Sequence, residues 1–123
     1  MNKIQSTRQA ITDRIFHDRA HRPELLEQRA TRQQQGWEVA QQAAQILKDQ
    51  FGVQRVVLFG SMLDINEINW RSDIDLAVWG LGKFDLFKAG AAIDRGHDFA
   101  IDLVPAEEAR PHIRLAIKQG VEL

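Results

Sequence analysis

Three aspartates stand in apolar, strand-like segments of this 123-residue chain, where carboxylates are unusual. Asp73 and Asp75 flank Ile74 at the start of one such segment, and Asp102 lies in the middle of another, FAIDLV. Because side chains alternate between the faces of a strand, Asp73 and Asp75 point to one side and Ile74 to the other. Two close carboxylates repel each other unless a cation neutralises them, and Mg²⁺ prefers such oxygen ligands. The spacing therefore predicts a metal site.

A Gly-Ser pair adds a second chemical element to this prediction. Gly60 and Ser61 directly follow the apolar run VQRVVLF. Glycine lets the backbone come close to a ligand, and free N–H groups after a strand can face an anion such as a phosphate. If the strand with Asp102 lies beside the strand with Asp75, three carboxylates converge on one edge of the sheet. Three carboxylates can hold two metal ions, which stabilise the attacking and leaving oxygens in phosphoryl-type transfer.

The N-terminal part of the chain must supply helices that support these residues. Residues 1–50 are rich in Arg, Gln, Ala and Glu, which favour helix. We expect a break at Arg22, because the residue before a proline avoids the helical region, and a second helix that begins at Pro23. Residues 28–36 are polar on all sides and form either a solvated helix or a flexible connector. A core-facing helix is predicted over 37–49 from a stripe of apolar residues, Trp37, Ala40, Ala44, Leu47 and Phe51.

From residue 53 onward, strands alternate with short helices. We expect strands at 53–59, 74–79 and 99–104, helices at 83–93 and 111–118, and a short edge strand at 121–123. This order predicts an α/β (α+β) fold, in which a small mixed β-sheet has helices on one face and an N-terminal helical extension. We place the extension at residues 1–36 and the sheet domain at residues 37–123.

Taken together, these motifs resemble the nucleotidyltransferases of the DNA polymerase β-like superfamily, and more closely the minimal nucleotidyltransferases. The resemblance covers roughly residues 37–123 and rests on the segments LFGS, SDIDLAV and IDLV. It implies a nucleotidyltransferase fold in which Gly60 and Ser61 hold the triphosphate of a nucleotide. It also implies that Asp73 and Asp75 bind metal and that Asp102, in the same metal-binding and catalytic set, activates the acceptor hydroxyl.

The resemblance further implies an enzyme with a protein partner. We expect a Mg²⁺-dependent nucleotidyltransferase that transfers AMP from ATP to a protein hydroxyl, a tyrosine of a HEPN-family ribonuclease toxin, and so acts as the antitoxin of a toxin–antitoxin pair. The alternative is a catalytically weakened antitoxin of the same fold that neutralises its toxin by binding. Modification of RNA ends or of a small molecule ranks lower, because no second substrate domain is evident.

The loop between the Gly-Ser pair and the first aspartate favours the binding alternative. Residues 62–72 contain Asp64, Glu67 and a single base, Arg71, where the family tends to have Arg and Gly residues. Arg71 is either a phosphate contact or a solvated loop residue. Trp70 is a candidate for stacking on a base, whereas Trp37 and Trp79 are expected to pack in the core or an interface. The four histidines show no metal-ligand spacing and are expected at the surface.

Composition limits the remaining classes of protein. Hydrophobic residues make up 44% and charged residues 27% of the chain, which fits a soluble globular domain. Without cysteine, disulfides and thiolate metal sites are excluded, and without an apolar run of membrane-spanning length or a signal-peptide h-region we expect a cytoplasmic protein. The net charge of −1 argues against direct DNA binding. Residues 1–32 hold seven bases and four acids, and form either a solvated helix or a docking arm for an acidic partner.

Overall fold

The structure is a computed structural model that describes residues 7–123, with side chains described from residue 24 onward. Most of the predicted docking arm, residues 1–32, therefore has side chains outside the described part. The elements follow in the order α1 (Thr7–Phe51), β1 (Arg55–Phe59), the 3-10 turn η1 (Ser61–Leu63), β2 (Ile74–Trp79), α2 (Leu86–Ile93), β3 (Ile101–Pro105), the 3-10 turn η2 (Ala106–Glu108), α3 (Pro111–Lys118) and β4 (Val121–Glu122). Every strand and helix expected after residue 53 is present, with ends shifted by at most three residues.

The N-terminal helix α1 is continuous over 45 residues. The predicted break at Arg22 and the predicted new helix at Pro23 were therefore wrong. Proline removes one backbone hydrogen bond and disfavours helix at the residue before it, but neighbouring Ala, Gln, Arg and Glu residues favour helix strongly enough to continue through it. Residues 28–36 are helical as well, and α1 passes without interruption from the expected extension into the expected sheet domain.

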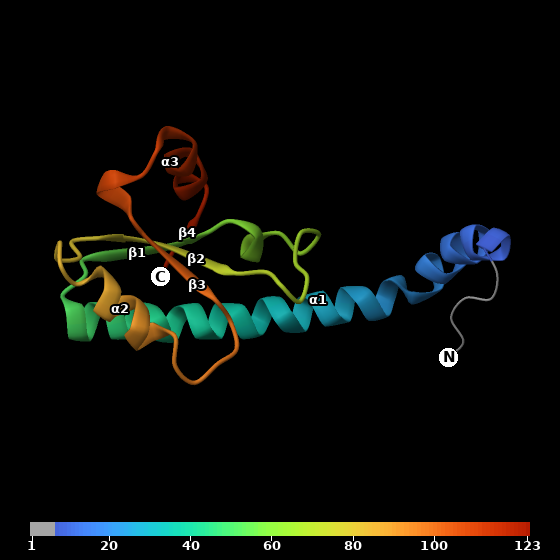
Figure 1. Ribbon diagram of the computed structural model, residues 1–123, viewed down its shortest axis with the longest axis horizontal. Coiled ribbons are helices and arrows are strands. Elements are labelled where there is room, and N and C mark those ends of the chain that lie inside the picture. Colours follow the sequence, from blue (N-terminus) through green and yellow to red (C-terminus); the bar gives the residue numbers. More distant parts are fainter. Residues whose placement is uncertain (1–6) are drawn as a thin grey trace.

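The four strands form one mixed sheet in the order β3-β2-β1-β4 (Figure 1). β1 is antiparallel to both β2 and β4, whereas β2 and β3 are parallel. The parallel pair places the starts of β2 and β3 at one end of the sheet. Because β1 runs the opposite way, its last residue Phe59 also lies at this end, opposite Asp75. The mixed sheet predicted from the sequence therefore brings three chain segments together at one end.

Helices α1 and α2 form the predicted layer on one face of the sheet, and α3 packs on the opposite face (Figure 1). The larger core lies under α1 and α2 and contains the buried residues Ala40, Ala44, Leu47, Val56, Leu58, Ile74, Leu76, Val78, Ala89 and Ile93. A smaller core lies under α3 and η2 and contains Val57, Phe59, Ala77, Ala106, Ala109 and Ile117. The predicted stripe of α1 is confirmed, since Ala40, Ala44 and Leu47 are buried while Trp37 and Phe51 pack against them at the edge.

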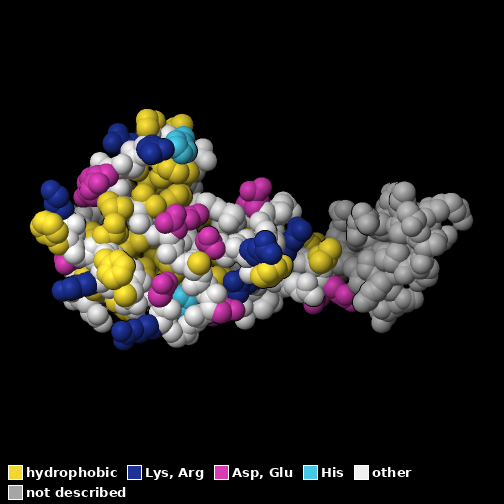
Figure 2. Space-filling model, viewed as in Figure 1, with side chains coloured by type: hydrophobic (Ala, Val, Ile, Leu, Met, Phe, Trp, Pro, Cys, Tyr) yellow, Lys and Arg dark blue, Asp and Glu magenta, His cyan; other side chains and the backbone are white. Residues whose placement is uncertain are grey.

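One feature of the surface bears on function. Phe84 and Phe87 are 88% and 89% exposed, and hydrophobic side chains lie on the surface over α2 in Figure 2. Among the helices that the structure describes, none combines the length and the apolar character needed to cross a bilayer.

Candidate active site

The aspartates of β2 and β3 lie side by side on one face of the sheet. In the parallel pairing of these strands, Asp75 is the direct partner of Asp102. Neighbouring strands are about 4.8 Å apart, so the two carboxylates leave the sheet next to each other. Asp73 directly precedes β2 and is exposed, and Ile74 points into the main core as predicted. The sheet thus brings the backbone of all three predicted aspartates to one place. Figure 2 shows several acidic side chains on this side of the molecule.

The electrostatics of Asp75 reflect this crowding. Partial burial, together with the negative charges of Asp102 and Asp73, raises the pKa of the Asp75 carboxyl to about 6, with burial the largest of the three causes. Each of these causes disfavours the ionised carboxylate. A group placed in this way binds either a proton or a cation more readily than an ordinary aspartate does.

Gly60 lies against the same carboxylate. Its φ of +87° and ψ of −155° belong to a region that only glycine adopts readily. A Cβ atom at this position would also collide with the Asp75 carboxylate. Both the backbone conformation and this contact therefore require a residue without a side chain. Ser61 then opens the short turn η1, in which the amide of Leu63 donates to the Gly60 carbonyl at 3.1 Å. The Gly-Ser pair and the aspartates therefore belong to one site.

The donor set of this site fits a hard divalent cation. All three candidate ligands are carboxylates. Asp75 and Asp102 are adjacent across the strands, and Asp75 is repelled more by Asp102 than by Asp73. In the part of the chain that the structure describes, no three Asp, Glu or His side chains are already gathered as a set of metal ligands. The backbone thus positions the carboxylates of Asp73, Asp75 and Asp102 near one another, but their side chains do not form a closed cage.

The loop between Ser61 and Asp73 is anchored by apolar residues. Met62 and Ile68 are 0% and 1% exposed, and both belong to the main core. The end of the loop is also ordered, because the amide of Asn69 donates to Ser72 Oγ at 2.9 Å. Core packing and this hydrogen bond thus hold the loop in place.

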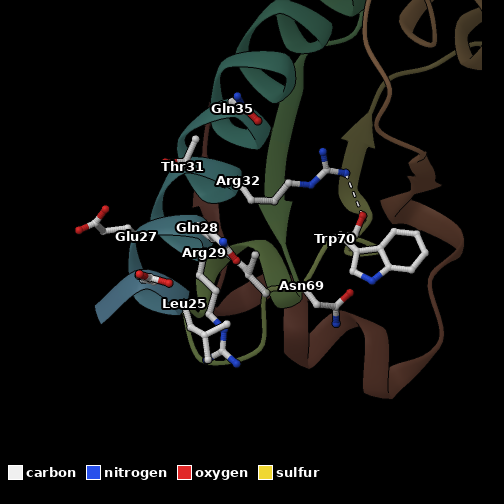
Figure 3. Close-up of a pocket in the computed structure, with 11 residues that line it drawn as sticks. Leu25, Glu27, Gln28, Arg29, Thr31, Arg32, Gln35, Asn69 and Trp70 are labelled. Atoms are coloured by element: carbon white, nitrogen blue, oxygen red, sulfur yellow. Dashed lines mark hydrogen bonds between the residues drawn. The ribbon is translucent and has the colours of Figure 1, made fainter. Parts of the chain in front are cut away.

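Three residues of α1 that sequence reasoning missed contact this loop. The Arg32 guanidinium donates to the Trp70 carbonyl at 3.3 Å, and Gln33 Nε2 donates to the Met62 carbonyl at 3.0 Å. Gly36 packs against the Met62 side chain. Arg32 also borders a groove of about 640 Å³ between α1 and the end of the loop (Figure 3). The sequence offered only a general signal, because residues 62–72 contain several apolar side chains, which favours packing of the loop but does not say against which residues.

The aromatic and histidine predictions can be compared with the structure residue by residue. Trp37 and Trp79 pack at the edges of the two cores, as expected. Trp70 is 74% exposed, and the Arg71 guanidinium lies 4.6 Å from its ring centre, so both stay candidates for nucleotide contact. His97 lies at the surface but is partly buried, and its Nδ1 accepts from the Phe99 amide at 3.1 Å. His112 is exposed, and the side chains of His17 and His21 lie outside the described part.

A small mixed sheet that places a Gly-Ser turn beside two adjacent strand aspartates defines a nucleotidyltransferase. The chain belongs to the polymerase beta nucleotidyltransferase family, whose family model matches residues 41–123. Neither the comparison with curated proteins nor the comparison with solved structures gave a match. The match starts within α1 and includes every strand, so the fold and the general chemistry of nucleotidyl transfer follow from it.

Proposed function

We propose that this protein transfers AMP from ATP to a hydroxyl of a partner protein. The observation that carries the proposal is the direct pairing of Asp75 with Asp102, next to the Gly60 turn. Nucleotidyl transfer by the family supplies the reaction class. The acceptor that we propose is a tyrosine of a HEPN-family ribonuclease toxin, which makes this protein the antitoxin of the pair, in the cytoplasm.

The roles of the individual residues follow from their positions. The backbone of Gly60 and Ser61 binds the triphosphate, because Gly60 leaves room beside Asp75 and the turn after β1 presents amide groups. Mg²⁺ bound by Asp73, Asp75 and Asp102 would neutralise the charge on the phosphates. Asp102, exposed at the edge strand β3, takes the proton of the incoming hydroxyl. The hydroxyl oxygen bonds to the α-phosphorus as the bond to the bridging oxygen of the β-phosphate breaks, and pyrophosphate leaves.

Two observations support a protein as the acceptor. Asp102 lies on an edge strand, so one side of the site has no further strand beside it and is open to a large substrate. Phe84 and Phe87 expose almost their whole side chains, and exposed apolar surface of this kind is common where proteins meet partners. A small-molecule acceptor would need neither feature.

The second candidate is an antitoxin that neutralises its toxin by binding alone. It is favoured by the acids of the loop, since Asp64 and Glu67 are exposed in the segment that joins the Gly-Ser pair to Asp73. Both acids repel the triphosphate and would slow the reaction. The three aspartates argue for catalysis, because a purely binding surface has no need of a repelling pair such as Asp75 and Asp102.

Mass spectrometry of the partner tests this proposal. The chain is co-expressed with a HEPN-family toxin, and the toxin is analysed for the added mass of AMP on a tyrosine. The proposal expects the modification with the wild-type chain and its loss with the Asp73→Ala/Asp75→Ala double variant. An unmodified toxin that still forms a complex with the wild-type chain would favour binding alone.

A further inference from the structure

Three residues of α1 hold the loop that joins the two halves of the site. Arg32, Gln33 and Gly36, here called the α1 clamp, all precede residue 41, where the match to the family begins. The loop that they contact, residues 62–72, separates the Gly-Ser pair from the first aspartate. The α1 clamp therefore acts on the site from outside the region that the family shares.

Arg32 links the entry segments of the two strands that carry the aspartates. Its guanidinium donates to the Trp70 carbonyl just before β2 and to Asp98 Oδ1 just before β3, at 3.3 and 3.4 Å (Figure 3 shows the first contact). It also stacks on the ring of Phe99, 3.6 Å from the ring centre. Its Nε is buried and has no hydrogen-bond partner within the described residues, so one donor stays unsatisfied in this position. The stack and the two hydrogen bonds offset that loss.

Gln33 and Gly36 hold the beginning of the same loop. Gln33 Nε2 donates to the carbonyl of Met62, the first loop residue, at 3.0 Å. A Cβ atom at Gly36 would stand 2.5 Å from Met62 Sδ, closer than packed atoms approach. With glycine at this helix position, the Met62 side chain lies fully buried against α1, and a larger residue would require that side chain to shift. The α1 clamp thus fixes both ends of the loop to one rigid helix.

We propose that the α1 clamp is a positioning element for nucleotidyl transfer. By holding residues 62–72 in one conformation, it sets where the Gly60-Ser61 pair stands relative to Asp73. The conformational entropy of the loop is then lost on folding rather than when the nucleotide binds. This inference rests on the proposed function, because it takes these residues as the site. In this proposal the clamp residues do not touch the substrate, and they act through the loop and, in the case of Arg32, also through the segment before β3.

Hydrogen exchange of the loop amides tests whether the clamp holds the loop. The amides of Leu63, Glu67 and Ser72 form hydrogen bonds within the segment 60–72, at 3.1, 2.9 and 3.0 Å. In the full-length chain, Gln33→Ala should raise the exchange rates of these amides about fivefold, the size expected for one lost hydrogen bond. Arg32→Ala removes two hydrogen bonds and a ring stack and should raise them at least as much. Amides of β1 and β2 should keep their wild-type rates, which shows that the fold is intact.

The same helix offers matched controls. Arg29→Ala and Gln34→Ala remove the same side-chain types, and neither residue has a hydrogen bond to the loop among the described contacts. Both should leave exchange in the loop within about twofold of wild type. The inference would be overturned if the loop amides exchanged at the same rate in the clamp variants, the controls and the wild type. It would also be overturned if the clamp variants accelerated exchange of the sheet amides as much as that of the loop amides.

A kinetic measurement tests the step from loop to reaction. The kcat/KM for ATP should fall about fivefold in Arg32→Ala and Gln33→Ala and stay unchanged in the two controls. A loosened loop with wild-type kcat/KM would overturn the positioning role. A wild-type chain without any metal-dependent transfer would instead contradict the proposed function, and in that case the exchange rates alone decide whether the α1 clamp holds the loop.

Discussion

Asp75 and Asp102 are direct partners across the parallel strands β2 and β3. Side chains at paired positions share a face, so the fold keeps two carboxylates together where each disfavours the ionisation of the other. A Cβ at Gly60 would collide with Asp75, so the Gly60-Ser61 turn, which we propose binds phosphate, lies at the same place. Such an arrangement costs stability, and in the proposed function it binds a cation and the phosphates that accompany it.

The raised pKa of Asp75 predicts that this residue destabilises the metal-free protein at neutral pH. Its folded pKa of about 6 lies above the ordinary value of 3.8, so the folded state binds the proton more tightly than the unfolded state. Stability from this group is therefore full below about pH 4 and is lost as the pH rises through 6. Asp75→Asn cannot ionise and should be more stable than wild type at pH 7.5, by about 1–2 kcal/mol after allowance for solvent screening.

Urea unfolding in the presence of EDTA checks this prediction. The free energies of unfolding of Asp75→Asn and wild type should be similar at pH 4 and diverge between pH 4 and pH 7. Asp94→Asn, a change at an exposed aspartate at the end of α2, serves as the control and should show no such divergence. A wild type that is as stable as Asp75→Asn at pH 7.5 would show that the carboxylate is not crowded.

The glycine of the turn should be irreplaceable for the fold as well as for the site. Gly60→Ala combines an unfavourable backbone conformation with a collision at Asp75, and should lower the free energy of unfolding by about 1–3 kcal/mol. Gly90→Ala is the matched control, because Gly90 lies inside α2 with no atom near an added Cβ. That change should be neutral or stabilise by up to about 1 kcal/mol, through helix propensity. Equal effects of the two changes on the urea midpoint would refute the special role of Gly60.

Growth of cells that carry the toxin separates catalysis from binding. The Asp73→Ala/Asp75→Ala double variant keeps the surfaces of α1 and α2 and should still form a complex with the toxin. If neutralisation depends on AMP transfer, cells with this variant should lose protection although the complex persists in a pull-down experiment. Full protection by the double variant would support the binding alternative.

The local parts of the fold and site were predictable from the sequence, and the parts that depend on distant contacts were not. The aspartates could be identified from the sequence because a carboxylate in an apolar strand is energetically costly and therefore unusual. The Gly-Ser pair could be identified because it directly follows an apolar strand-like run. The strands after residue 53 followed from their apolar alternation. The predicted break before Pro23 was wrong because the helix preference of the long surrounding segment outweighed the local effect of the proline. Arg32 could not be found, since its partners Trp70 and Asp98 are 38 and 66 residues away in the sequence.

The central claim is that Asp75 and Asp102 perform metal-dependent nucleotidyl transfer, and in vitro transfer measures it most directly. The purified chain is incubated with α-labelled ATP, Mg²⁺ and a HEPN-family toxin, and label on the toxin is followed over time. Wild type and Asp94→Asn should label the toxin at the same rate, EDTA should stop the labelling, and Asp75→Asn and Asp102→Asn should each slow it by at least about a hundredfold. The claim would be contradicted if Asp75→Asn labelled the toxin at the wild-type rate, or if the wild type gave no labelling with Mg²⁺ present.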